Sequence, residues 1–196
     1  MKFLGIDTSC GGMVVAANGK KKSVRPIEGV TSVCIMGEIE GALKDVELRI
    51  NDVDFIACVV GPGSFTGIRI GISTVKGLCF ACGKQALALT SFDCIAYAER
   101  EKALALVDAG HGNYYACPFE KGVRGEPVFL SQEELVVYQE KGFRFLSGKP
   151  LAVGSEIVDT AQGLLEAAKK NAHALHDANA LAALYLRKSS AEEGRK

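Results

Sequence analysis

The chain has 196 residues, enough for one large domain or two small ones with a hydrophobic core. Hydrophobic residues make up 48% of it, which indicates a folded globular protein. Lysine plus arginine and aspartate plus glutamate number 23 each, so the formal net charge is zero. This balance argues against a stand-alone nucleic-acid-binding protein, because phosphate contacts need clustered positive charge.

The first half of the chain is a succession of strands and helices. Apolar runs bounded by turn residues predict strands, and apolar residues at helical spacing predict helices. The expected strands are residues 2–6, 13–17, 20–25, 54–60 and 86–89. The expected helices are residues 31–45, 66–82 and 91–100, with Gly83 ending the second.

The second half opens on a weak copy of the first. The run "LALVDAGHGNYYACPF" (104–119) repeats "FLGIDTSCGGMVVAAN", with Asp108 at the position of Asp7 and Gly110 at that of Ser9. Each copy has a strand, an aspartate-containing turn and a second strand. Such a duplication predicts two similar α/β lobes rather than one doubly wound sheet.

The rest of the second half predicts a thinner lobe. Strands are expected at 126–130 and 150–154, and helices from the Ser131–Glu134 capping box to about 141, at 156–175 and at about 177–188. We expect a first lobe at 1–98, a smaller second lobe at 99–176 and a frayed tail at 189–196. The two lobes would join near residues 95–103.

The glycine-rich stretch "GPGSFTGIRIGISTVKGL" (61–78) is open to two interpretations. It fits neither a P-loop nor the dinucleotide fingerprint, because Thr66 stands where the third glycine would be. One interpretation is a helix N-terminus that attracts an anion. The other is a stripe of small residues, with Gly67, Gly71 and Thr74 on one face, that lets another backbone approach.

The turn at Asp7 and Ser9 is also ambiguous. Such a turn can hold phosphate through its backbone N–H groups and hydroxyl, with the aspartate near a metal ion. It can equally be an ordinary turn in which the aspartate side chain bonds its own backbone. No catalytic constellation and no metal-binding set of ligands stand out.

Four segments together resemble the TsaB (YeaZ) family, the bacterial partner proteins in threonylcarbamoyladenosine synthesis on tRNA. They are "FLGIDTS" at the start, residues 61–78, "VDAGHGNYYACPF" (107–119) and "LYLRKSSAE" (184–192). The resemblance implies an actin-like ATPase (ASKHA, ribonuclease H-like) fold of two duplicated lobes with a reduced second lobe. The C-terminal helix at about 177–188 would pack back on the first lobe.

The resemblance also implies a function without catalysis. Family members are homologues of TsaD, whose metal motif HxxxH has no counterpart here, since residues 29–50 contain no histidine. The chain would be a scaffold that binds TsaD and recruits the ATPase TsaE, supporting transfer of threonylcarbamoyl to N6 of adenosine 37. That adenosine lies in tRNAs that read codons beginning with A. A small kinase or ATPase of the same fold, or a glycoprotease-type metallopeptidase, is the alternative.

The implied partners and sites follow. The interface with TsaD, shared with a homodimer of the isolated chain, would be a set of residues on helix 66–82: Gly67, Ile70, Gly71, Thr74, Val75 and Leu78. Residues Asp7, Ser9, Asp108 and Gly110 would be vestiges of phosphate loops. We expect no intrinsic cofactor, with ATP or ADP and metal on the partner subunits, and tRNA contact only through the complex.

The cysteines and the lengths of the apolar runs indicate where in the cell the protein is expected. Seven cysteines, an odd number, lie mostly in apolar runs, which favours buried thiols in a reducing cytoplasm. No apolar run is expected to reach the length needed to cross a membrane.

Overall fold

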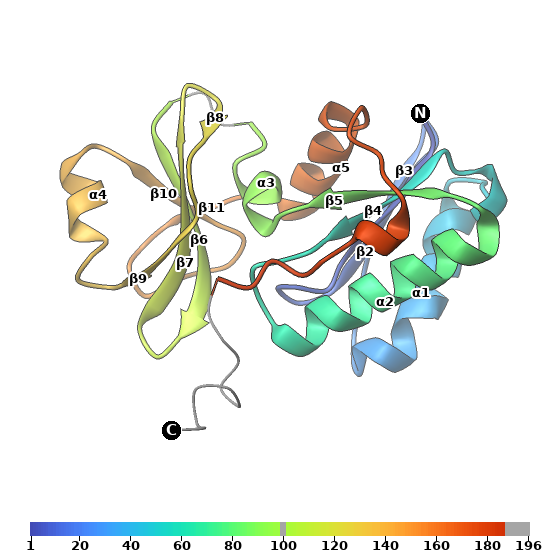
Figure 1. Ribbon diagram of the computed structural model, residues 1–196, viewed down its shortest axis with the longest axis horizontal. Coiled ribbons are helices and arrows are strands. Elements are labelled where there is room, and N and C mark those ends of the chain that lie inside the picture. The colour runs from blue at the N-terminus through green and yellow to red at the C-terminus, as the bar shows by residue number, and fades with distance from the viewer. Residues whose placement is uncertain (99–100, 187–196) are drawn as a thin grey trace.

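The computed structural model of the protein describes residues 1–98 and 101–186. The expected tail at 189–196 therefore lies outside the described residues. Two β-sheets lie side by side along the long axis of the molecule (Figure 1).

The first sheet is built from the first half of the chain. Its strand order is β3-β2-β1-β4-β5, with antiparallel pairing around β2 and parallel pairing of β1, β4 and β5. The strands are β1 (Phe3–Asp7), β2 (Met13–Ala17), β3 (Lys22–Pro26), β4 (Phe55–Val59) and β5 (Gln85–Leu89). A short 3-10 turn, η1 (Ile50–Asp52), leads into β4.

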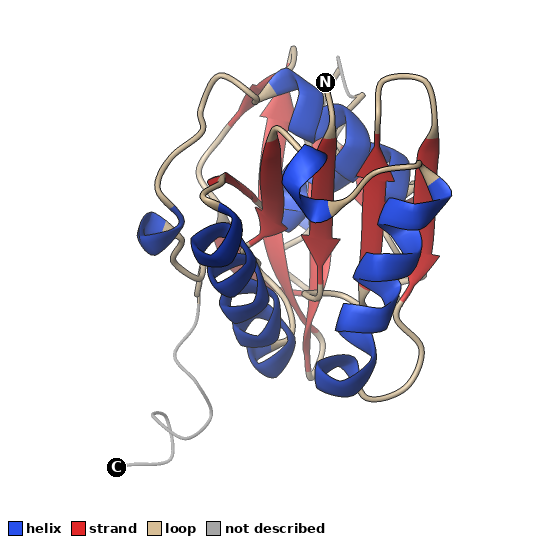
Figure 2. Cartoon of the chain, turned by 90° about the vertical axis from the view of Figure 1, so that its right-hand side faces the viewer, coloured by secondary structure: helices blue, strands red, loops and turns tan. Residues whose placement is uncertain are grey.

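Helices cover both faces of this sheet (Figure 2). Side chains alternate along a strand, so each strand contributes to two cores. Ile6 and Ile56 pack toward α1 (Thr31–Asp45) and α2 (Phe65–Cys82). Phe3 and Phe55, with ring centroids 5.3 Å apart, pack on the opposite face against α5 (Thr160–Lys170).

The second sheet has the order β11-β10-β6-β7-β8, and β9 pairs with β7. Its strands are β6 (Ala103–Gly110), β7 (Asn113–Glu120), β8 (Val123–Arg124), β9 (Val128–Ser131), β10 (Arg144–Ser147) and β11 (Glu156–Ile157). One face packs on α3 (Ser91–Ile95), and the other packs on α4 (Val136–Glu140) and the segments around it.

The two sheets share one plan. The β6–β7 hairpin corresponds to β1–β2, β10 to β4 and β11 to β5, in the same spatial order and with the same parallel and antiparallel pairing. The second copy is reduced: α4 has 5 residues where α1 has 15, and residues 148–155 contain no helix where the first lobe has the 18-residue α2. The expected α/β fold of two duplicated lobes with a smaller second lobe is confirmed.

The lobes exchange helices. The last helix of the first half, α3, packs on the second sheet through Phe92 and Ile95. The last helix of the second half, α5, packs on the first sheet through Leu164 and Leu165. The two helices also contact each other, and a Cβ added to Gly163 would collide with the carbonyl oxygen of Cys94. A division of the chain at residue 98 therefore does not divide the packing, because each half contributes a helix to the other half's sheet.

Three expected elements differ from the expectation in the described residues. Residues 150–154 form no strand, since β10 at 144–147 takes the place beside β6. The helix expected at 91–100 ends at Ile95. The helix expected at about 177–188 is wrong: residues 178–180 form a single 3-10 turn, η2 (Ala178–Ala180), and residues 181–186 are not helical.

Hydrogen bonds to the first lobe explain the path of this segment. The backbone of His176 pairs with Ala86 in both directions, at 2.9 and 3.0 Å. The N–H of Leu184 donates to the carbonyl oxygen of Val60 at 2.8 Å. Backbone groups paired in this way cannot form the i to i−4 bonds of a helix, so tertiary contacts outweigh the helical propensity of the alanines.

Helix α2 also corrects the expectation about apolar length. It is 18 residues long with a mean hydropathy of 1.2, so by length and composition alone it could cross a membrane. This is weak evidence, because the core helix of a soluble protein passes the same test. One face of α2, which includes Ile68 and Val75, is buried within the protein.

Candidate functional site

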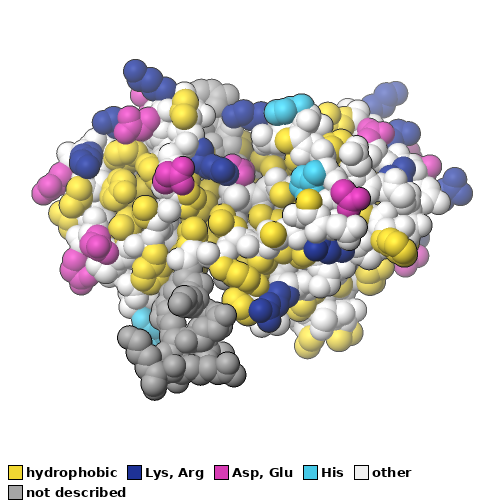
Figure 3. Space-filling view, viewed as in Figure 1, with side chains coloured by type: hydrophobic (Ala, Val, Ile, Leu, Met, Phe, Trp, Pro, Cys, Tyr) yellow, Lys and Arg dark blue, Asp and Glu magenta, His cyan; other side chains and the backbone are white. Residues whose placement is uncertain are grey.

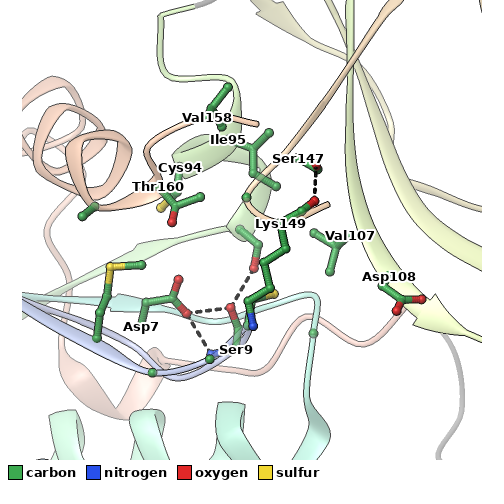
Figure 4. Close-up of a pocket in the computed structure, with 18 of the residues that line it drawn as sticks. Asp7, Ser9, Cys94, Ile95, Val107, Asp108, Ser147, Lys149, Val158 and Thr160 are labelled. Carbon is green, nitrogen blue, oxygen red and sulfur yellow. Dashed lines mark hydrogen bonds between the residues drawn. The ribbon is translucent and has the colours of Figure 1, made fainter. Parts of the chain in front are cut away.

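The two lobes enclose a cleft of about 740 Å³ (Figure 4). Its lining comes from the turn after β1, the loop before α2, α3, the end of β6, the loop after β10 and the start of α5. The cleft brings together Asp7, Ser9 and Asp108, three of the four residues assigned to phosphate turns. Gly110, the fourth, is not among the lining residues.

Asp7, Ser9 and Ser91 form a hydrogen-bonded floor of the cleft. Asp7 ends β1 and is only 4% exposed. The backbone N–H of Ser9 donates to Asp7 Oδ1 at 2.8 Å, and the Ser9 hydroxyl donates to the same oxygen at 2.6 Å. Ser91 Oγ lies 3.0 Å from Ser9 Oγ and donates to the carbonyl oxygen of Pro62 at 2.7 Å.

Burial raises the pKa of Asp7 above its ordinary value of 3.8, because the charged carboxylate loses its water. The hydrogen bonds from Ser9 and the positive charge of Lys149 act in the opposite direction. The second carboxyl oxygen, Oδ2, has no hydrogen-bond partner among the described residues. No fully buried side-chain oxygen or nitrogen there lacks a partner, so Oδ2 is accessible from the cleft. Figure 4 shows it pointing into the space between the lobes.

Lys149 enters the cleft from the second lobe. The buried Ser147 donates to the carbonyl oxygen of Lys149 at 2.6 Å. Gly148 lies so close to Thr160 that an added Cβ would be 2.7 Å from its methyl group. These contacts fix the turn from which the lysine extends.

The ammonium group of Lys149 crosses to the first lobe. A Cβ on Gly11 would lie 2.9 Å from Lys149 Nζ, so a side chain there would displace the lysine. The φ angle of +133° at Gly11 also requires glycine. Among the described residues the ammonium forms no hydrogen bond and no ion pair.

In each of the two aspartate turns, the backbone N–H two residues after the aspartate already donates a hydrogen bond to the aspartate side chain. Ser9 N donates to Asp7, and Gly110 N donates to Asp108 Oδ1 at 2.8 Å. These N–H groups are therefore engaged rather than aimed at a ligand. Within residues 1–98 and 101–186, no group of three or more His, Cys, Asp or Glu side chains is arranged to hold a metal ion. The arrangement is suited to binding a small molecule through Lys149 and Asp7.

The sequence did not point to Lys149 or Ser91. Ser91 lies inside the Thr90–Asp93 capping box, which indicates only the start of a helix. Lys149 lies in a Ser-Gly-Lys-Pro turn with no spacing relation to Asp7. Both reach the cleft through the packing of the lobes, which leaves no local signal.

The central residues of the interface expected on α2 face the interior of the protein. Gly67, Gly71 and Val75 are buried inside the protein. A Cβ on Gly67 would collide with the carbonyl oxygen of Thr8, and one on Gly71 would collide with the Thr8 hydroxyl. Thr8 Oγ1 also donates to the carbonyl oxygen of Gly67 at 2.7 Å. The glycines thus bring α2 close to the turn after β1.

The remaining stripe residues are half-buried. Ile70 and Leu78 pack against the same core from its edge, and Thr74 lies between them. The fully exposed side of α2 carries other residues, above all Phe80, which is 92% exposed. On the neighbouring α1, Val33 is 75% and Met36 is 52% exposed. We call Val33, Met36 and Phe80 the helical apolar face.

Comparisons with known proteins agree with this architecture. A profile of the family described as "TsaD: tRNA N6-adenosine threonylcarbamoyltransferase" matches residues 31–126. The tRNA threonylcarbamoyladenosine biosynthesis protein TsaB of Haemophilus influenzae is 29% identical over 123 residues, covering 59% of this chain and 52% of that protein. TsaB of Escherichia coli is 27% identical over 130 residues, covering 62% and 55%. The chain thus aligns with about half the length of these relatives.

Among solved structures, YeaZ from Pseudomonas aeruginosa superposes with a TM-score of 0.78 at 23% identity. The match covers 94% of this chain and 99% of that one. At this identity the superposition establishes the shared fold, which is actin-like. The sequence matches to TsaB and the fold shared with YeaZ together show that the chain is similar to proteins of the TsaB (YeaZ) family, which is related to TsaD.

Proposed function

We propose that this protein is an accessory subunit in the bacterial synthesis of threonylcarbamoyladenosine on tRNA. It binds the threonylcarbamoyltransferase TsaD, supports its activity and helps to recruit the ATPase TsaE. The chain itself is not catalytic, is cytoplasmic, and contacts tRNA only within the complex. The names of its relatives support the pathway, and one structural feature supports docking.

That feature is the helical apolar face. Val33 and Met36 lie near the start of α1 and Phe80 near the end of α2, and large apolar side chains this exposed are costly in water, which favours burial against a partner. Each helix carries a glycine next to its exposed side chain: Gly37 one turn after Val33, and Gly77 one turn before Phe80. A Cβ added at either glycine would meet nothing, so both open onto solvent. A helix of a partner can pack its side chains into the gaps that these glycines leave.

The same face serves two partners in turn. In isolation, two copies of the chain pair through it, and TsaD replaces the second copy in the complex. Catalytic groups, nucleotide and metal belong to the partner subunits, because α1 contains no histidine where the HxxxH motif of TsaD would be expected.

Co-purification with the TsaD of the same organism tests the proposal. Val33→Asp places a charge in the proposed contact and should weaken binding at least about tenfold. Val137→Asp is the matched control, because Val137 is also an exposed helical valine (48%) but lies on α4 of the second lobe.

Thermal unfolding of each variant shows whether a loss of binding reflects a loss of the fold. Both variants should unfold near the temperature of the native chain, since both sites are on the surface. Failure of the native chain to bind TsaD contradicts the proposed function. Equal binding by the Val33→Asp variant places the contact on another surface.

A further inference from the structure

We propose that the cleft between the lobes binds a small organic acid whose single carboxylate or phosphate monoester pairs with Lys149 and whose hydroxyl or amine donates to Asp7. The rest of the ligand is an apolar or aromatic body. This inference does not rest on docking with TsaD, because the cleft and the helical apolar face share no residue.

The size and walls of the cleft suit such a molecule. Small-molecule sites have volumes of about 300–1,000 Å³, and the cleft has about 740 Å³. Most of the wall is apolar and comes from both lobes. The apolar lining residues include Met13, Val24, Ile95, Val107, Leu151 and Val158. An apolar body is therefore removed from water on both sides, and this contributes the non-specific part of the affinity.

Lys149 supplies the attraction for an acid. It is the one cationic residue in the lining of the cleft among the described residues, and its ammonium has no partner there. The turn beneath it is held by Ser147, and Gly11 leaves space for it on the opposite lobe. A charged group held in place before binding loses little conformational freedom when the ligand arrives.

The two other carboxylates of the lining are engaged with their own backbones. Asp108 accepts from Gly110 N at 2.8 Å, and Asp159 accepts from the N–H groups of Ala161 and Gln162 at 3.0 Å each, at the start of α5. A single lysine with acidic neighbours suits one anionic group. It does not suit a metal-bound triphosphate, which needs several cations and free N–H groups.

Asp7 supplies the second, directional contact. Its carboxyl group is more than nine-tenths buried, Oδ1 is used by Ser9, and Oδ2 opens into the cleft without a partner among the described residues. A buried polar group gains most from a hydrogen bond that water cannot easily replace. A hydroxyl or amine of the ligand can donate to this oxygen while the acid group pairs with Lys149.

The experiment uses the full chain and four probes in two matched pairs, followed by NMR titration. One pair is 4-hydroxybenzoate and its uncharged amide, 4-hydroxybenzamide. The other is adenosine monophosphate and uncharged adenosine. The pairs distinguish a carboxylate from a phosphate as the acid group, and inorganic phosphate alone tests whether the apolar body is needed.

At least one acid should bind saturably and shift resonances of the cleft, and its uncharged counterpart should bind at least about tenfold more weakly. Lys149→Gln should weaken binding of the acid by a similar factor. Lys149→Arg keeps the positive charge and should retain most of the affinity. Asp7→Asn should weaken binding of the acid, but the variant should still bind the acid more tightly than its uncharged counterpart. Lys20→Gln, an exposed lysine on the β2–β3 hairpin, is the control and should change nothing.

Several results would overturn the proposal. One is the absence of a saturable shift at the cleft with either acid up to about 10 mM, a range that also detects millimolar sites. The others are equal binding of an acid and its uncharged counterpart, unchanged binding in Lys149→Gln, and inorganic phosphate binding as tightly as the organic acids. Thermal unfolding of each variant shows whether the fold is retained. If Asp7→Asn does not fold, acid binding by the two Lys149 variants tests the proposal.

Discussion

Asp7 and Asp108 make the same contact in the two lobes: each accepts, through Oδ1, the backbone N–H two residues later at 2.8 Å. Yet Asp7 is buried and Asp108 is exposed. The loop before α2 covers the first turn, where Ser64 N donates to the carbonyl oxygen of Ser9 at 2.7 Å. The second lobe has no helix in the place of α2, so its turn lacks this cover. Loss of one helix thus makes two equivalent aspartates chemically different.

We expect Gly71 and Gly77, two of the three glycines of α2, to respond oppositely to alanine. Gly71→Ala should lower the free energy of unfolding by about 1–3 kcal/mol, because the added methyl collides with Thr8 in a packed interior. Gly77→Ala, on the exposed side of the same helix, should raise it by about 0.5–1 kcal/mol, because alanine loses less backbone entropy than glycine. Urea unfolding followed by circular dichroism measures both.

The same contact revises the effect of Gly71→Arg. On the sequence alone this change would block a partner and leave the fold intact. The buried position predicts loss of the fold itself. A folded Gly71→Arg variant would show that α2 can move away from Thr8, contrary to the packing described above.

Asp7 should make stability depend on pH. Its folded pKa is raised above 3.8, so the folded chain binds this proton more readily than the unfolded chain. The associated stability is fully present below pH 3.8 and is lost as the pH rises through the folded pKa. Relative to Asp7→Asn, the native chain should therefore become less stable as the pH increases from about 4 towards neutrality. Calorimetry of both proteins across this range gives the difference, and a difference that grows in the opposite direction would contradict the raised pKa.

The C-terminal segment should contribute measurably to stability through Tyr185. Its ring stacks on Phe65 with centroids 4.4 Å apart, and Arg69 lies over the same phenyl ring at 4.0 Å. Tyr185→Ala should lower the free energy of unfolding by about 1 kcal/mol, as for other aromatic pairs. Tyr185→Phe keeps the stacking and loses only the exposed hydrogen bond from Arg69, so it should be nearly neutral. Equal effects of the two changes would show that stacking contributes little.

The isolated chain should bind tRNA weakly. The net charge is zero, and lysines and arginines alternate with acidic side chains over the face shown in Figure 3, without an extended patch of either sign. At physiological salt we expect a dissociation constant above about 1 μM, the range of non-specific binding. Filter binding with TsaD absent measures it. Sub-micromolar affinity would contradict the proposal that tRNA is reached only through the complex.

Local patterns in the chain were enough to place the elements that have a strong apolar period and to reveal the duplication. The helix at 31–45 and the strand at 13–17 have the bounds expected from their patterns, and Gly83 ends α2 in the left-handed conformation. These features are local: burial of one face and a glycine at the helix end decide them wherever the segment packs. The order of elements around Asp7 and Asp108 then repeats along the chain, and this repeat is visible without coordinates.

The surface against which each pattern packs depends on tertiary contacts. A stripe of small residues looks the same in sequence whether it lies against Thr8 or against a partner helix, so the direction of Gly67 and Gly71 could not be read from spacing. Alanine-rich residues 177–186 favour a helix by only tenths of a kcal/mol per residue. Hydrogen bonds of His176 to Ala86 and of Leu184 to Val60 outweigh that preference. Lys149 meets Asp7 for the same reason: the approach of two lobes brings together groups that are 142 positions apart in the chain.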